Sequence, residues 1–150
     1  MTWLRSARLA ALALVSIAAL ANGGESKKFE RSVPFRPEET KLGLKLDKVT
    51  IESVRVRHWP DPDDFRKAEK DLNDKHTVFV EFTYSNRDLD RSYKCRYEVK
   101  VPGPDAHADR TATLDKGKVG DTNKLMLKMR TNDYKTAKTM KLSLEVWPKE

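Results

Sequence analysis

The chain has 150 residues, of which 30 are Lys or Arg and 23 are Asp or Glu, and its formal net charge at pH 7 is +7. This length suits one domain of ordinary size. The charged fraction of 35% excludes a polytopic membrane protein, and the single cysteine excludes a disulfide scaffold or a multi-cysteine zinc module.

Residues 1–21 have the composition of a secretory signal peptide. Arg5 and Arg8 precede an apolar run over 9–20, and Ala19-Leu20-Ala21 supplies the small residues of a cleavage site. A membrane anchor would need about 20 apolar residues to cross a hydrocarbon core of about 30 Å. We therefore expect export and cleavage after Ala21, which lowers the net charge from +7 to +5.

The destination of the exported chain is indicated by what the sequence lacks. A single thiol forms no internal disulfide, although the compartment is oxidising. The chain also has no Asn-x-Ser/Thr acceptor for glycosylation. These features favour a bacterial protein that is periplasmic or extracellular.

Residues 22–40 contain charge, Gly and Pro but no periodic apolar face. This composition predicts a flexible N-terminal tether before a folded domain over 41–150. Phe29, Val33 and Phe35 are the residues of this segment that could dock on the domain.

From residue 41 onward, apolar residues recur with a period of two, which is typical of half-buried strands. In 92–101 the inward positions are expected to be Tyr93, Cys95, Tyr97, Val99 and Val101. Cys95 is therefore predicted to be a buried, inert thiol, with an intermolecular disulfide as the alternative. The other predicted strands lie within 42–51, 54–56, 76–86, 111–114, 125–129 and 140–146.

Two local irregularities are predicted in this pattern. The apolar phase shifts by one residue between Ile51 and Val54, so a bulge or break is expected near Glu52-Ser53. Residues 61–72 open with an Asp cap followed by Pro, and then carry apolar residues at helical spacing. This insertion predicts a short helix of two to three turns.

About seven short strands with turn signals between them predict an all-β fold, a two-sheet antiparallel sandwich with one short inserted helix. A small closed antiparallel barrel is the alternative, because the number of strands does not separate the two.

Residues 90–99 resemble the Tyr-x-Cys strand of immunoglobulin domains, in Tyr93, Cys95 and the alternation that follows. Asp90 lies five residues before Cys95 rather than six, and no partner cysteine exists. The resemblance implies an immunoglobulin-like or fibronectin-III-like sandwich at the level of architecture, and it carries no function.

A metal site is one candidate for chemistry. His58 and His76 flank the insertion, which begins with Asp61, Asp63 and Asp64. Imidazoles and carboxylates at one loop mouth could hold a divalent ion such as zinc, if neighbouring strands bring the histidines together. The spacing matches no known metal signature, and the alternative is a set of solvated loop residues. No other cofactor is expected.

A basic C-terminal half is the second candidate. The net charge of the mature chain comes from residues 111–141, which contain eight basic and three acidic residues. Such a surface would attract an acidic protein or an anionic envelope polymer, or it would simply keep sheet edges soluble. The candidate partner-binding bases are Lys116, Lys118, Lys124, Lys128, Arg130, Lys135, Lys138 and Lys141.

Trp59 and Trp147 each end a predicted strand before a proline. They are expected to close the ends of the sandwich, or alternatively to form a platform for a carbohydrate or a protein partner.

No catalytic motif is present, which favours a protein that is not an enzyme. The sequence therefore predicts an exported binding or assembly module of the cell envelope, without a transmembrane segment in the mature chain and without a nucleic-acid partner. A metal-dependent protein and a carbohydrate-binding module are the alternatives. The oligomeric state stays open.

Overall fold

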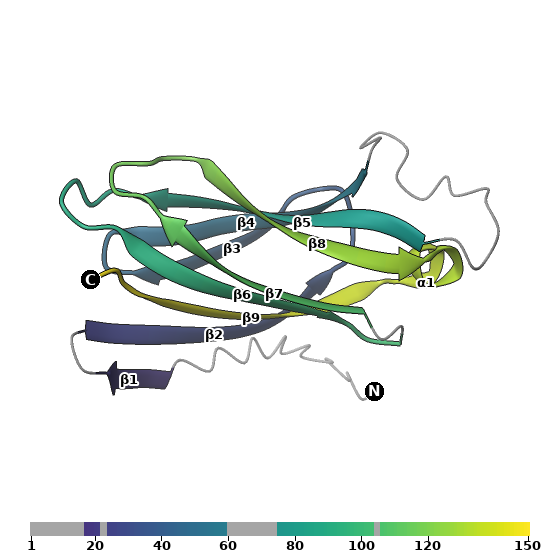
Figure 1. Ribbon diagram of the computed structural model, residues 1–150, viewed down its shortest axis with the longest axis horizontal. Coiled ribbons are helices and arrows are strands. Elements are labelled where there is room, and N and C mark those ends of the chain that lie inside the picture. The colour runs from purple at the N-terminus through teal and green to yellow at the C-terminus, as the bar shows by residue number, and fades with distance from the viewer. Residues whose placement is uncertain (1–16, 22–23, 60–74, 104–105) are drawn as a thin grey trace, which may run out of the picture.

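The computed structural model describes residues 17–21, 24–59, 75–103 and 106–150, and they form two layers of β-strands (Figure 1). One layer, sheet A, has five strands in the order β1 (Ile17–Ala21), β2 (Gly24–Pro34), β9 (Thr139–Pro148), β6 (Tyr93–Val101) and β7 (Ala106–Leu114). The other layer, sheet B, has four strands in the order β3 (Thr40–Leu46), β4 (Val49–Trp59), β5 (Lys75–Asn86) and β8 (Asp121–Arg130).

All neighbouring strands are antiparallel. Sheet A ends at β1 and β7, and sheet B ends at β3 and β8, so neither sheet closes on itself. The predicted two-sheet antiparallel sandwich is therefore confirmed, and the alternative of a small closed barrel is wrong. The predicted strands all lie within β3 to β9, but the turn at 47–48 was not predicted. The segment 42–51 therefore spans β3 and the start of β4, and 54–56 is the part of β4 after the bulge.

The core lies between the sheets and is built from the alternating positions of each strand. In β6 every second residue from Tyr93 to Val101 is buried, as the sequence pattern predicted. Across the interface, the ring of Tyr97 lies 4.5 Å from that of Phe82 on β5, measured between centroids. The Tyr97 hydroxyl also accepts a 2.9 Å hydrogen bond from Asn123 Nδ2 on β8. The polar end of this buried ring is therefore satisfied.

The predicted bulge is present in β4. Its pairing with β5 shifts register between Ile51 and Ser53. The shift turns Val54 and Val56 toward the core after Ile51, and all three are at most 1% exposed. It also places Arg55 and Arg57 on the outer face of sheet B, the side turned away from sheet A.

The tether predicted for residues 22–40 is wrong where the chain is described. Residues 24–34 form β2, which pairs with β9 from Lys27↔Val146 to Pro34↔Thr139. Phe29, Val33 and Phe35 are buried in the core, at 3%, 3% and 1% exposure. The folded domain therefore begins before residue 41.

The alternation of apolar and polar residues expected of a strand is not visible in the sequence of β2, because basic residues occupy some of its inward positions. Arg31, between Phe29 and Val33, extends to the sandwich edge and donates a 2.9 Å hydrogen bond to the Leu42 carbonyl. Lys27 similarly donates to the Lys45 carbonyl at 3.1 Å. A long basic side chain can bury its aliphatic part at an inward position while its charged group stays at the edge of the sandwich. The inward positions of β2 are therefore not all apolar, and the sequence does not show the alternation of a half-buried strand.

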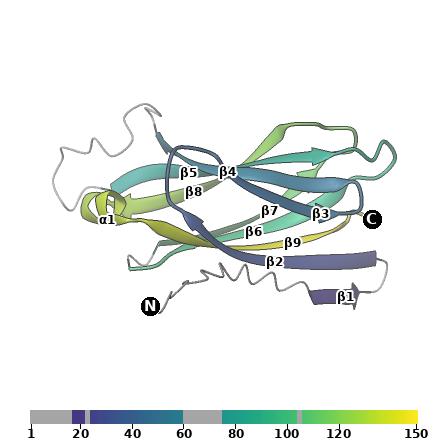
Figure 2. The ribbon, with the colours of Figure 1, turned by 180° about the vertical axis from the view of Figure 1, so that it is seen from behind.

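Strand β1 lies outside β2 and pairs with it from Ile17↔Lys28 to Ala21↔Gly24 (Figures 1 and 2). These five residues are the end of the segment predicted to be a signal peptide, and the prediction of cleavage after Ala21 stays a prediction.

The helix predicted for 61–72 lies outside the described residues. The described part contains a different short helix, α1 (Thr131–Thr136), which links β8 to β9. Its Tyr134 is fully buried, and its ring meets that of Phe35 edge-on at 6.4 Å. Burial of Tyr134 holds this turn against the core.

The two sheets are also joined along the side where β7 and β8 are the edge strands. Arg110 of β7 donates a 2.9 Å hydrogen bond from Nη1 to the carbonyl oxygen of Lys124 on β8. An edge carbonyl of sheet B is thereby bonded by a side chain from sheet A.

The loops at the far end from α1 are held by buried polar groups. Asn86 is fully buried, and its Nδ2 donates to the carbonyls of Arg91 and Leu114 at 2.9 and 3.0 Å. The amide of Gly117 donates to the Asp88 carbonyl at 2.9 Å and ties two loops together. Leu89 and Val119 project from these loops and are 76% and 60% exposed.

Candidate functional site

A row of charged residues crosses the outer face of sheet B. The register places Arg55 of β4 opposite Glu81 of β5, and Glu81 opposite Lys124 of β8. Side chains directly opposite each other on antiparallel strands lie on the same face and interact. One acid is thus flanked by a base on each side.

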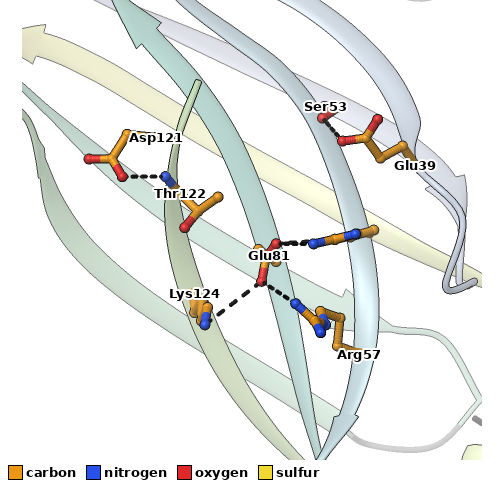
Figure 3. A network of polar contacts seen from close by, with 8 residues as sticks. Glu39, Ser53, Arg57, Glu81, Asp121, Thr122 and Lys124 are labelled. Atoms are coloured by element: carbon orange, nitrogen blue, oxygen red, sulfur yellow. Dashed lines mark hydrogen bonds and ion pairs between the residues drawn. The ribbon is translucent and has the colours of Figure 1, made fainter. Parts of the chain in front are cut away.

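Glu81 is the organising group of this face, because three cations lie around its carboxylate (Figure 3). Arg55 donates to Oε1 from Nε at 3.1 Å and from Nη2 at 2.7 Å. The other oxygen, Oε2, lies 3.6 Å from Nη1 of Arg57 and 3.9 Å from Nζ of Lys124. The side chain of Glu81 is 4% exposed, although it points away from the core.

The three cations are bound to Glu81 unequally. Arg55 makes short, charge-assisted hydrogen bonds. Arg57 and Lys124 lie beyond hydrogen-bond distance from the carboxylate, and their side chains are 37% and 52% exposed. Their N–H groups are therefore attracted to Glu81 but still turned to solvent.

The next rows continue the same surface toward α1. Arg57 lies opposite a half-buried Phe79, which lies opposite Met126. Lys128 and Arg130 follow on β8, at alternate positions with the buried Leu127 and Met129. We call this surface the basic face and define it by Arg55, Arg57, Lys124, Lys128 and Arg130.

The acids near the basic face are engaged. Glu81 neutralises one of the five positive charges of the basic face. Glu39 accepts a 3.2 Å hydrogen bond from Ser53, and Glu52 accepts one of 2.8 Å from Ser85. Both serines lie on the part of the sheet nearer the β3–β4 turn. The surplus of positive charge is therefore concentrated toward the α1 end.

The outer face of sheet A is different, because it carries two pairs of exposed side chains in which a base lies beside an acid. Arg96 Nη2 lies 3.3 Å from Asp109 Oδ2, and His107 Nε2 lies 3.4 Å from Glu98 Oε1. These pairs are exposed and weak, but they leave little local surplus of charge. The asymmetry between the faces distinguishes sheet B.

The structure does not bring the eight predicted bases together. Lys124, Lys128 and Arg130 share the basic face. Lys141 lies on β9 in sheet A, and Lys116 and Lys118 lie in the loop before β8. Lys135 lies in α1, and Lys138 follows it. The grouping along the sequence is dispersed because consecutive strands change sheet.

Sequence reasoning missed Arg55, Arg57 and Glu81. They come from strands β4 and β5, in a part of the chain whose total charge is balanced. A usable signal was present, since Arg55 and Arg57 alternate with the inward Val54 and Val56. Only the pairing of β4, β5 and β8 shows that they share a surface with Lys124.

The predicted metal site is placed only in part. His58 pairs with Val78, so the backbone positions of His58 and His76 are diagonal neighbours on paired strands. Their side chains, and Asp61, Asp63 and Asp64, lie outside what the structure describes. Among the described residues, no three His, Cys, Asp or Glu side chains gather in a group that could hold a metal ion. The metal site stays a prediction.

Of the two tryptophans predicted to form a platform, the structure describes the side chain of one. Trp147 is half-buried on β9, where it lies opposite Lys94. The side chain of Trp59 is outside the described part. The structure therefore brings no pair of tryptophans together as a sugar platform within its described residues.

Cys95 is buried at 0% exposure and is unpaired. Burial raises the pKa of its thiol to about 12, and the nearby charge of Glu145 acts in the same direction. Such a thiol stays protonated at neutral pH and is a poor nucleophile, in agreement with the sequence prediction.

No family model, curated protein or solved structure matched this chain. In the described part of the chain, no helix has both the length and the apolarity to cross a membrane.

Proposed function

We propose that this protein is an exported, non-enzymatic binding module of the cell envelope that contacts an acidic ligand through the basic face. The observation that carries the proposal is the grouping of Arg55, Arg57 and Lys124 around the buried carboxylate of Glu81. The export part rests on the signal-peptide pattern of residues 1–21.

The arrangement suits anion binding for two physical reasons. Glu81 holds Arg55 through two hydrogen bonds and attracts Arg57 and Lys124, so a ligand meets cations that are already gathered on one surface. Arg57 and Lys124 then keep exposed N–H groups that an incoming carboxylate or phosphate can accept. Lys128 and Arg130 extend the positive field and steer an acidic ligand toward it.

The test compares two double variants with the same net charge. Lys124→Gln with Lys128→Gln removes two charges from the basic face, and Lys100→Gln with Lys141→Gln removes two from exposed, paired positions on sheet A. The probes are polyphosphate and poly-L-glutamate, each immobilised, and the sample is the mature chain, 22–150. We expect the first variant to lose affinity roughly tenfold and the second to bind nearly as the parent does.

Two outcomes would count against the proposal. If both variants lost affinity equally, net charge alone would explain binding. If the parent chain bound neither probe at low salt, the basic face would have no function of this kind.

Export is tested separately. When the full chain is produced in a bacterium, we expect the product outside the cytoplasm to begin at Asn22, as N-terminal sequencing or intact mass would show. A product that keeps residues 1–21 and stays in the cytoplasm would contradict this part of the proposal.

We also propose that the relationship to immunoglobulin-like sandwiches is one of architecture alone. Tyr93 and Cys95 lie on β6, an interior strand of sheet A, which supports the likeness. However, β3, β4 and β5 follow one another within sheet B, whereas an immunoglobulin chain changes sheet after its second strand.

A further inference from the structure

An apolar side chain projects from the basic face. Met126 lies on β8 between Lys124 and Lys128 and is 54% exposed. Its cross-strand neighbour Phe79 is only half-buried, and Arg57 lies beyond Phe79 in the same row. The basic face therefore has an apolar strip, Phe79 and Met126, with cations on three sides.

This apolar strip would distinguish between two kinds of acidic ligand. A soluble polyanion offers charge to Arg57, Lys124 and Lys128 but nothing apolar to cover Met126. A lipid surface offers anionic headgroups for the cations and acyl chains just below them for the methionine. Basic residues around an exposed apolar side chain are the usual composition of surfaces that bind at a membrane interface.

The position of the strip fits this ligand. Met126 lies on β8, an edge strand of sheet B, so it projects near a margin of the sandwich. Lys124 and Lys128 lie two residues to either side, about 7 Å away along the strand. Their flexible stems let the ammonium groups reach the headgroups while Met126 passes between them.

We propose that the basic face docks on a lipid surface rich in anionic headgroups, with Met126 inserted at the interface. This inference rests on the proposed anion-binding function and names its ligand. The protein would bind peripherally, through charge first and apolar contact second. An anionic protein and a soluble polymer are the competing ligands, and the experiment separates them.

The test measures cosedimentation of the mature chain, 22–150, with vesicles of phosphatidylcholine alone and of phosphatidylcholine mixed with phosphatidylglycerol. Binding to soluble polyphosphate and to poly-L-glutamate is measured in parallel. The key variant is Met126→Ser, which changes no charge. Its matched control is Leu89→Ser, because Leu89 is also exposed and apolar but lies in a loop at the opposite end.

We expect binding to vesicles that contain phosphatidylglycerol, none to phosphatidylcholine alone, and release by salt. Met126→Ser should weaken vesicle binding roughly fivefold and leave polyphosphate binding unchanged, because only the lipid contacts the methionine. Leu89→Ser should change neither.

The failures are distinguishable. Binding to polyphosphate or poly-L-glutamate without binding to vesicles would overturn the lipid assignment and leave the proposed function standing. Binding to no probe would overturn both. Vesicle binding that Met126→Ser leaves at the parent level would overturn the insertion of Met126.

Discussion

Glu81 shows how a single carboxylate can organise a surface of the opposite charge. It is buried although it lies on an outer face, since Arg55, Arg57 and Lys124 cover it. Its role is to gather the cations on one surface, at the cost of neutralising one of them. Removing it should therefore affect stability and binding in opposite directions.

The first prediction concerns the substitution Glu81→Gln. It leaves three cations close together without their counter-ion, so the free energy of unfolding should fall by about 1 to 3 kcal/mol. Affinity for polyphosphate should rise, because the face gains one net charge and a polyanion can itself bring the cations together. Urea denaturation and binding measurements check the two effects, with the exposed Glu30→Gln as the control. A variant that is destabilised but binds less would show that Glu81 mainly shapes the site.

The second prediction concerns pH and the buried thiol of Cys95. Its pKa is raised from 9.0 to about 12 in the folded protein, so between pH 9 and 12 only the unfolded chain loses this proton. The stabilisation is complete below pH 9 and is lost as pH rises, by about 1.4 kcal/mol at pH 10. Urea midpoints from pH 8 to 10 measure this loss.

The matched variant is Cys95→Ala, which lacks the titrating group. Its overall stability will be lower because a cavity is left, but its stability should fall less steeply over the same pH window. An equal pH slope in both proteins would contradict the assignment to Cys95.

At the level of the element, β2 is the strand whose importance the sequence least suggests. Phe29 and Val33 are buried in the core, and β2 pairs along eight residues with β9. It is an integral part of sheet A, so its loss would expose one edge of β9 and open the core.

The third prediction follows from this placement. Phe29→Ala should lower the free energy of unfolding by about 3 to 5 kcal/mol, as expected for a buried aromatic side chain. Its neighbour Lys28 is exposed, and Lys28→Ala should change stability by less than about 0.5 kcal/mol. Thermal or urea denaturation checks both. Equal, small effects would mean that residues 24–34 are a tether after all.

The elements differ in how far the sequence predicts them, and the reason is physical. Strand β6 was predictable because its inward positions are all apolar and its outward positions all charged. The bulge in β4 was predictable from the shifted phase after Ile51. Strand β2 was not, because Lys27 and Arg31 occupy inward positions at its rim.

The candidate site was predictable only in its β8 half. Lys124 and Lys128 stand out in a basic segment of the sequence. Their partners Arg55 and Glu81 come from β4 and β5, and nothing local in the sequence indicates that β8 returns to pair with β5 after two strands in the other sheet. Charge can be counted along a chain, but a surface is set by non-local pairing.

For the whole molecule, the net charge is less informative than its placement. The outer face of sheet A carries two exposed pairs of a base and an acid, while that of sheet B concentrates bases around Glu81. The molecule therefore has a more positive side, formed by sheet B. Such a dipole orients the protein before contact with an acidic surface.

The fourth prediction concerns the rates of association with anionic vesicles and of dissociation from them. Raising the ionic strength should mainly slow association, since screening weakens the long-range attraction of the positive side. Met126→Ser should mainly speed dissociation, because a short-range contact is lost. Surface plasmon resonance on captured vesicles measures both rates. A change in association rate for Met126→Ser equal to that caused by salt would contradict this division.

The hydrogen bond from Arg110 to the Lys124 carbonyl matters when many copies of the protein lie close together on one surface. A lipid surface that gathers many copies of one protein raises their local concentration, and sandwiches with open strand edges are then liable to polymerise side by side. Here the edge strand nearest the lipid has one of its carbonyls already bonded by the molecule's own guanidinium. On the proposed lipid surface, this strand would therefore offer one pairing group fewer to a neighbouring molecule than a fully open edge would.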